Sequence, residues 1–286
     1  MTALNRYTFS GHDSFHCRQL WLKKGYDYAK AGLHFSREDA VVKLGVGKNM
    51  VSSIRFWLKA FNIIDNKDIP TEFGKRLFDS ENGYDPFLED EASLWLLHYH
   101  LVKSGYASIY GLIFNEFRRE KMFFDQKTFI NYIKRVGEGK DEIHFNENTL
   151  SKDFSVFVNL YKNDSDGKDI EDSFSGILAE LDLLMIKEKL YYIENNERDS
   201  LPSSIILYAI LDNPTYGNSI SLNLLENECN SPGSIFALSR AGLLNKISEI
   251  VDSNKGINYT DQAGIKELQF KEKPKPLSLL DLYYGK

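Results

Sequence analysis

The stretch from Lys48 to Phe61 carries two helical repeats at once, and this double pattern constrains the fold more than any other feature of the chain. In one repeat, large apolar residues recur at intervals of four, three and four: Met50, Ile54, Trp57 and Phe61. In the other, basic and hydroxyl residues recur at the same intervals: Lys48, Ser52, Arg55 and Lys59. Residues three and four apart share a face of an α-helix. The stretch therefore predicts an amphipathic helix with a buried apolar side and an exposed basic side.

The residues on either side of this helix predict a winged helix-turn-helix module. The segment Ser36–Leu44 begins like a capping box and predicts a short first helix, and Gly45-Val46-Gly47 predicts a tight turn after it. Downstream, residues 63–69 contain a polar turn between isoleucines and predict a small two-stranded wing. Residues 71–78 predict a closing helix. We therefore assign residues 1–80 to one winged-helix module.

The basic side of the predicted helix 48–60 is a candidate DNA-binding surface. Residues 1–76 contain 13 Lys and Arg against 7 Asp and Glu, whereas residues 77–286 contain 22 against 34. A basic module on an acidic body favours contact with a polyanion in the first quarter of the chain. We expect the helix to enter the major groove of double-stranded DNA. The candidate site residues are Lys48, Asn49, Ser52, Arg55 and Lys59. The alternative is a winged helix that docks a protein.

The rest of the chain predicts more helices and a second, weaker module. Residues 81–198 predict a helical middle domain, with one helix starting at Asp85-Pro86. Residues 199–270 predict a second winged helix-turn-helix. Its expected parts are a helix from Ser231-Pro232-Gly233 through Arg240 and a hairpin of residues 247–251 with 257–259. We expect this module to have a packing or protein-contact role rather than to bind DNA, because its candidate recognition helix exposes only Arg240 as a cation in an acidic region.

The last residues, 271–286, predict an extended strap that buries its terminal aromatic side chains. The fold class is accordingly mostly α, with winged helix-turn-helix modules at the N- and C-terminal ends and a helical middle domain.

Composition and motif spacing argue against several kinds of chemistry. The two cysteines, Cys17 and Cys229, cannot form a disulfide framework or a four-cysteine zinc site. The chain has no apolar signal core and no run long enough to span a bilayer, so we expect a cytoplasmic protein. The glycines of residues 45–49 lack the spacing of a phosphate-binding loop.

No motif in the chain predicts an active site, so we expect no catalytic residues, no metal and no cofactor. His12, His16, Cys17 and His34 are potential metal ligands, but no carboxylate pair completes a site around them. Acidic pairs occur at 89–91, 141–142 and 171–172. A nuclease would need such acids to converge on a metal ion, and the sequence leaves this alternative open.

Several short strings resemble one bacterial family of unknown function. They cover the chain from about residue 9 to its end: Phe9-Ser10-Gly11-His12-Asp13-Ser14-Phe15, Arg18, Trp21-Leu22-Lys23-Lys24, Leu44-Gly45-Val46-Gly47-Lys48-Asn49-Met50-Val51, Tyr84-Asp85-Pro86-Phe87-Leu88-Glu89-Asp90, Leu94-Trp95-Leu96-Leu97-His98, Phe114-Asn115, Asp153, Glu171-Asp172-Ser173-Phe174, Ser231-Pro232-Gly233, and Leu279-Leu280-Asp281 with Tyr283-Tyr284. Together they resemble the bacterial domain-of-unknown-function family 4007.

The resemblance implies a biological setting but no catalytic residues. Genes of this family tend to lie beside genes for phosphoadenosine-phosphosulfate-reductase-like proteins and cysteine desulfurases, in loci for DNA phosphorothioation and phage defence. The resemblance implies a role near sulfur modification of DNA. Combined with the basic face of helix 48–60, this predicts a non-enzymatic DNA-binding accessory protein, with a phosphoadenosine-phosphosulfate-reductase-like protein as a second partner. Two alternatives stay open: a transcription regulator of such a locus, which would be dimeric and bind a palindrome, and an adaptor for a sulfur-transfer enzyme. The oligomeric state also stays open.

Overall fold

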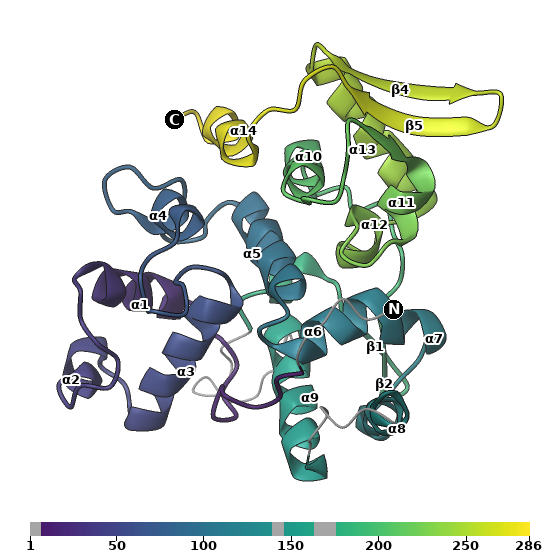
Figure 1. Cartoon of the computed structure of the whole chain (residues 1–286). Helices are drawn as coiled ribbons and strands as arrows, with labels where there is room; N and C mark the ends of the chain where they lie inside the picture. Colours follow the sequence, from purple (N-terminus) through teal and green to yellow (C-terminus); the bar gives the residue numbers. More distant parts are fainter. Residues whose placement is uncertain (1–6, 139–145, 163–175) are drawn as a thin grey trace. The chain divides into compact units, whose positions relative to one another are not determined.

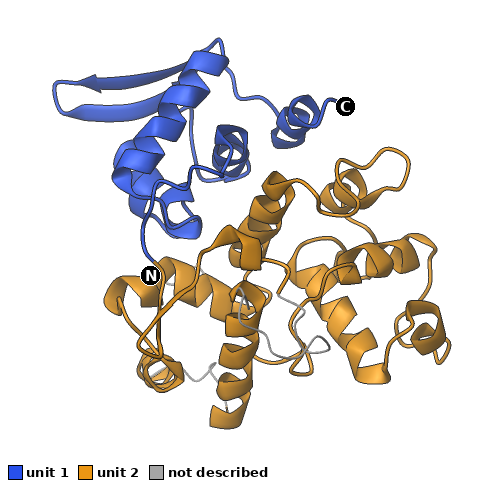
Figure 2. Ribbon diagram, turned by 180° about the vertical axis from the view of Figure 1, so that it is seen from behind, with its two compact units in different colours: residues 1, 194–286 blue, residues 2–193 orange. Residues whose placement is uncertain are grey.

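The computed structural model describes residues 7–138, 146–162 and 176–286, and these are mostly helical with two small antiparallel sheets (Figure 1). The expected mostly α fold class is confirmed at this level. The chain divides into two compact units, residues 194–286 (unit 1) and residues 2–193 (unit 2) (Figure 2). Among the helices of the described residues, none has the length and apolarity that a membrane crossing needs.

Unit 2 is built from helices joined by short turns, with one small hairpin near its end. In chain order its elements are α1 (Trp21–Lys30), α2 (Ala40–Leu44), α3 (Lys48–Ala60), α4 (Glu72–Phe78), α5 (Glu91–Ser104), α6 (Ser108–Leu112), the π-helical turn η1 (Ile113–Phe117), α7 (Arg118–Glu120), α8 (Gln126–Gly137), α9 (Glu147–Tyr161), the 3-10 turn η2 (Ala179–Leu181), β1 (Met185–Lys187) and β2 (Leu190–Tyr192). The strands β1 and β2 pair antiparallel, with Ile186 opposite Tyr191.

The core of unit 2 is strongly aromatic. Its largest fully buried side chains include residues of α3, α5, α6, η1 and α9: Trp57, Trp95, Tyr99, Tyr110, Phe114, Phe117 and Tyr161. Helix α5 is buried on nearly every side, which explains why its apolar residues do not form a single stripe. Large rings bury much apolar area per residue, so this core supplies much of the stabilisation of unit 2.

Helix α5 starts later than the sequence predicts. Asp85-Pro86 is not its first turn: the N-cap is Asp90, whose carboxylate accepts from the Ala92 N–H at 2.9 Å. Asp85 instead accepts from the N–H groups of Glu89 and Asp90, at 2.9 Å each. A carboxylate that closes a turn uses the same chemistry as a helix cap, so residue types alone did not separate the two roles.

Unit 1 combines helices with a three-stranded antiparallel sheet of order β3-β5-β4. Figure 1 shows its long hairpin, β4 with β5. Its elements are α10 (Ser203–Leu211), β3 (Ser219–Ser221), α11 (Leu222–Asn227), α12 (Pro232–Ile235), α13 (Arg240–Ser253), β4 (Ile257–Gln262), β5 (Ile265–Phe270) and α14 (Pro276–Tyr283). Helix α10 is the apolar centre of this unit and packs against α13 and α14.

Two expectations for unit 1 were wrong. The helix that starts at Ser231-Pro232-Gly233 ends at Ile235 instead of continuing to Arg240, because Ala237 has a left-handed backbone with φ of 48°. A new helix, α13, begins after the N-cap Ser239 and includes residues 247–251, which we expected to be a strand. The real hairpin is β4 with β5, in which Tyr259 pairs with Leu268.

The C-terminal residues also differ from the predicted strap. They form the helix α14, with Pro276 in its first turn, rather than an extended segment. Leu279 and Leu280 are the buried residues of this helix, whereas Tyr283 is 37% exposed. The final aromatic residues are therefore not the anchor of the C-terminus.

Candidate nucleic-acid interface

The turn between α2 and α3 depends on two glycines. Gly45 ends α2 with a left-handed backbone, φ of 68°, and a Cβ there would face open space. Gly47 is the extended N-cap of α3. The left-handed region costs an L-residue about 1 kcal/mol, so the backbone rather than packing favours glycine at position 45. The predicted turn and the predicted helix at residues 48–60 are both confirmed.

The apolar side of α3 is buried as expected, but against different partners. Ile54 and Trp57 are fully buried, and the Trp57 Nε1 donates to the Phe15 carbonyl at 3.0 Å. The Trp57 ring also packs on Tyr110 of α6 and lies parallel to the His12 ring, with centroids 6.1 Å apart in both pairs. The segment before α1 and the helix α6 therefore hold α3 in place, in addition to the predicted contact with α2.

Helix α1 approaches α3 closely enough to require a small residue. A Cβ on Gly25 of α1 would lie 2.6 Å from the Leu58 side chain and 2.7 Å from that of Ile54. This close packing, together with the buried Trp57, fixes the rotation of α3 about its axis. The opposite side of α3 must then face away from the core of unit 2.

Four of the five predicted site residues lie on that outward side. Lys48, Asn49, Ser52 and Arg55 are exposed, and α3 contains no acidic residue. The exception is Lys59, whose side chain is only 9% exposed. The sequence placed Lys59 in the exposed stripe, and this was wrong, because a turn beyond α3 covers it.

The covering turn is residues 65–69, and Asp68 is its charged group. Asp68 has a left-handed backbone, φ of 63°, and its side chain is 14% exposed. Its carboxylate contacts the Arg55 guanidinium through Nε, at 2.9 and 3.0 Å, and through Nη2, at 2.9 Å. It also contacts the Lys59 Nζ at 2.9 Å. Two cations of the predicted stripe therefore share one carboxylate.

The hydrogen bonds of the cluster shift the pKa of both Asp68 and Arg55. Burial alone would raise the pKa of Asp68, but hydrogen bonds from Arg55 and then Lys59 outweigh it and hold the pKa below its usual value. The hydrogen bond to Asp68 likewise raises the pKa of Arg55. The cluster of Arg55, Lys59 and Asp68 thus carries a net charge of about +1 at neutral pH.

The predicted two-stranded wing is reduced to a single antiparallel bridge between Ile64 and Pro70. Asp65 explains this difference, because its side chain accepts from the N–H groups of Lys67 and Ile69 at 2.8 and 2.9 Å. Those donors are then used within the turn rather than between strands. Pro70 has no N–H to extend a ladder. A compact turn therefore replaces the wing beside α3.

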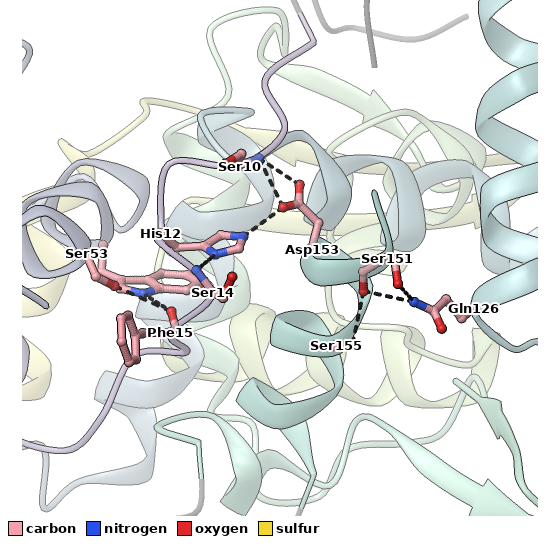
Figure 3. A network of polar contacts seen from close by, with 10 residues as sticks. Ser10, His12, Ser14, Phe15, Ser53, Gln126, Ser151, Asp153 and Ser155 are labelled. Atoms are coloured by element: carbon pink, nitrogen blue, oxygen red, sulfur yellow. Dashed lines mark hydrogen bonds and ion pairs between the residues drawn. The ribbon is translucent and has the colours of Figure 1, made fainter. Parts of the chain in front are cut away.

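A second polar centre lies on the buried side of α3, where the segment before α1 meets α9 (Figure 3). Asp153 accepts from the Ser10 N–H through both oxygens, at 3.0 Å each, and contacts the His12 Nε2 at 2.9 Å. The Ser14 N–H donates to the His12 Nδ1 at 3.2 Å. Because Nδ1 accepts, the neutral ring carries its proton on Nε2 and donates it to Asp153.

This second centre is structural in character. His12 and Asp153 are 4% and 3% exposed, and both ring nitrogens of His12 are engaged. The pair anchors the segment before α1, whose Phe15 carbonyl in turn receives Trp57. Reasoning from residue types missed this pair, although both residues belong to strings that carried the family resemblance.

The described residues do not gather the potential metal ligands into a cluster of three or more. Within the described residues, no group of three or more His, Cys, Asp or Glu side chains could hold a metal ion. Among the acidic strings, Asp90 caps α5, whereas residues 141–142 and 171–172 lie outside the described residues. Cys17 is fully buried, and this burial raises the pKa of its thiol.

Comparison with known proteins gives one family and two similar solved structures. A model described as a protein of unknown function (DUF4007) matches residues 9–284. A magnesium ion-bound SspB crystal structure and another SspB crystal structure each share 29% sequence identity with this chain, with TM-scores of 0.84 and 0.83. Both alignments cover 97% of this chain and 88% of the other. No curated protein matches the sequence significantly.

Proposed function

This chain belongs to the DUF4007 family, as its sequence strings predict, and on that premise we propose that it binds double-stranded DNA through α3. Its place would be in a bacterial DNA phosphorothioation or phage-defence system, with a phosphoadenosine-phosphosulfate-reductase-like protein as a further partner. The similarity to SspB structures over nearly the whole chain makes SspB the natural point of comparison for this proposal.

The observation that supports DNA binding best is the outward face of α3. This face carries Lys48, Asn49, Ser52 and Arg55, all exposed, and the helix follows a glycine turn as a recognition helix does. Cationic, hydroxyl and amide side chains are the types that contact phosphate oxygens and base edges in the major groove. The buried Trp57 and the close contact at Gly25 hold this face in a fixed orientation.

We assign unit 1 a different task, contact with protein. Its element order, α10-β3-α11-α12-α13-β4-β5, supports the proposal of a winged helix-turn-helix with α13 in the recognition position. The two cations of α13 are already engaged, since Arg240 pairs with Glu226 at 3.5 Å and the buried Lys246 pairs with Glu249 at 3.6 Å. A face with so little available positive charge is poorly suited to DNA and suits a protein partner better.

The test is the affinity of the full chain for a labelled duplex, measured by fluorescence anisotropy at several salt concentrations. We expect steep weakening with salt and a further loss with Lys48→Glu. Lys255→Glu in unit 1, also an exposed lysine, is the matched control for the change in net charge and should bind like the unaltered protein. Equal affinity of both variants would refute the role of α3. A strong preference for palindromes by a dimer would instead favour the transcription regulator.

A second candidate function, magnesium-dependent nicking of DNA, is favoured by one observation. A solved structure similar to this chain is of magnesium ion-bound SspB. The described residues do not provide a cluster of three ligands, so we derive no hydrolytic step. The test is incubation of supercoiled plasmid, plain or phosphorothioated, with the protein and Mg²⁺, Mn²⁺ or EDTA. Metal-dependent nicking that follows the protein through purification and is lost on replacing Glu89, Asp90 or Glu171 would overturn the non-enzymatic assignment.

A further inference from the structure

The cluster of Arg55, Lys59 and Asp68 supports a more specific role than charge alone. We infer that Arg55 reads a guanine in the major groove and that Asp68, neutralised by Lys59, holds the guanidinium in position for this. The inference rests on the proposed DNA binding of α3, and it names the feature of the DNA that gives specificity.

The geometry of the ion pair leaves one edge of the Arg55 guanidinium, between its two terminal nitrogens, available to a DNA base. The Asp68 carboxylate occupies the side of the guanidinium formed by Nε and Nη2. A guanidinium has five N–H donors, so the opposite edge, with one N–H from each terminal nitrogen, remains available. Within the described part of the chain, no hydrogen bond engages this edge. Two parallel donors at that spacing match the O6 and N7 acceptors of guanine.

Lys59 offsets the negative charge of Asp68 within the cluster. Its Nζ lies 2.9 Å from an Asp68 oxygen and donates to the Asn66 carbonyl at 3.1 Å. With its side chain only 9% exposed, Lys59 is poorly placed to contact DNA itself. It instead offsets the charge of Asp68, so that a carboxylate beside the DNA surface does not repel the phosphates. Arg55 thereby keeps the net positive charge of the cluster at its exposed tip.

Arg55 and Lys48, the two exposed cations of this face, differ in how firmly their side chains are held. Lys48 is exposed at the first turn of α3 and has no ion pair among the described residues, which suits a mobile contact to phosphate. Arg55 is 45% exposed but fixed by three contacts to one carboxylate. Ordering before binding lowers the entropy cost of a directional contact, and base readout needs such direction more than phosphate contact does.

The test is a selection from randomised duplexes with the full chain, followed by affinity measurements on the selected site. We expect a guanine at one position, preferred about 5- to 150-fold over the other bases. Replacement of that guanine by 7-deazaguanine, which lacks N7, should remove the preference. Replacement by inosine, which keeps O6 and N7, should retain it.

Three variants separate this role from its rivals, with folding of each verified by thermal unfolding. We expect Arg55→Ala and Arg55→Lys to lose the preference at this position, and Asp68→Asn to weaken it because the guanidinium becomes mobile. Equal loss of affinity for every duplex in Arg55→Ala would overturn the inference and make Arg55 a phosphate contact. Higher affinity of Asp68→Asn for every duplex, with the preference kept, would overturn it and make Asp68 a competitor of DNA. Absence of any DNA binding by the unaltered protein would refute the proposed function itself, and the inference with it.

Discussion

Replacement of Trp57 by alanine is expected to destabilise unit 2 strongly before it affects any ligand. The indole is fully buried where α3 packs on α6 and on the segment before α1, and its Nε1 donates to the Phe15 carbonyl at 3.0 Å. Truncation of a buried tryptophan to alanine costs about 3–5 kcal/mol through lost burial and the remaining cavity. For a unit of this size that corresponds to a fall in Tm of about 6–20 °C.

The tryptophans themselves provide the assay. All three of them, Trp21, Trp57 and Trp95, belong to unit 2, so their fluorescence follows this unit alone, whereas far-UV circular dichroism follows both units. Trp57→Phe is the matched control, because it keeps an aromatic ring in the site. It loses the hydrogen bond to Phe15, worth about 1 kcal/mol, and less buried area than alanine loses, so its Tm should fall less. A Trp57→Ala protein with an unchanged Tm and selectively lost DNA binding would refute the buried role of this residue.

Three further predictions concern residues of unit 2 outside α3: Asp153, Asp79 and Gly45. Asp153→Ala should lower the stability of unit 2 by about 3 kcal/mol, since the Ser10 N–H loses its buried acceptor. Rapid proteolysis near Ser10 would accompany this, and an unchanged cleavage pattern would count against the anchoring role. The pKa of Asp79 is lowered to about 2, mainly by its hydrogen bond to Lys30, so its contribution to stability is present above about pH 4 and is lost as the pH falls toward 2. Asp79→Asn should therefore flatten the fall of Tm over that acid range, and a variant with the same pH profile as the unaltered protein would contradict the assignment. Gly45→Ala should cost about 1 kcal/mol because φ is 68°, whereas Gly45→Asn should cost less; equal stability of the two would argue against the left-handed turn.

Helix α3 could be predicted from the sequence because its signal is local. Its apolar repeat, the glycines before it and the absence of acidic residues all lie within one short stretch, and Ile54 and Trp57 are buried as the repeat requires. The family could also be predicted, because its strings are spread over the whole chain.

The burial of Lys59 could not be predicted, because it depends on the conformation of a turn. Residues 65–68 read as a polar turn in the sequence, and nothing in their composition shows that Asp68 folds back onto α3. The same limit applies to the pair of His12 and Asp153, which are far apart in the chain and meet only through the packing of α9.

The wrong strand prediction in unit 1 has a different origin, the choice between helical and strand periodicity. Residues 247–251 are rich in apolar side chains and suit a strand or a helix equally well over so short a window. A longer stretch of the sequence indicates a helix, because Leu243, Ile247 and Ile250 follow at intervals of four and three. All three are buried in α13. A helix prediction that began at the N-cap residue Ser239 would have given α13 correctly.

The salt dependence of DNA binding tests the central claim, that the outward face of α3 contacts DNA, most directly. The measurement compares the slope of log affinity against log salt for the unaltered protein and for Lys48→Ala, with Lys255→Ala as the control in unit 1. If Lys48 contacts a phosphate, the slope of Lys48→Ala should be smaller by about 0.9, and that of the control should not change. Identical slopes for all three proteins, or no measurable binding to DNA at low salt, would contradict the account.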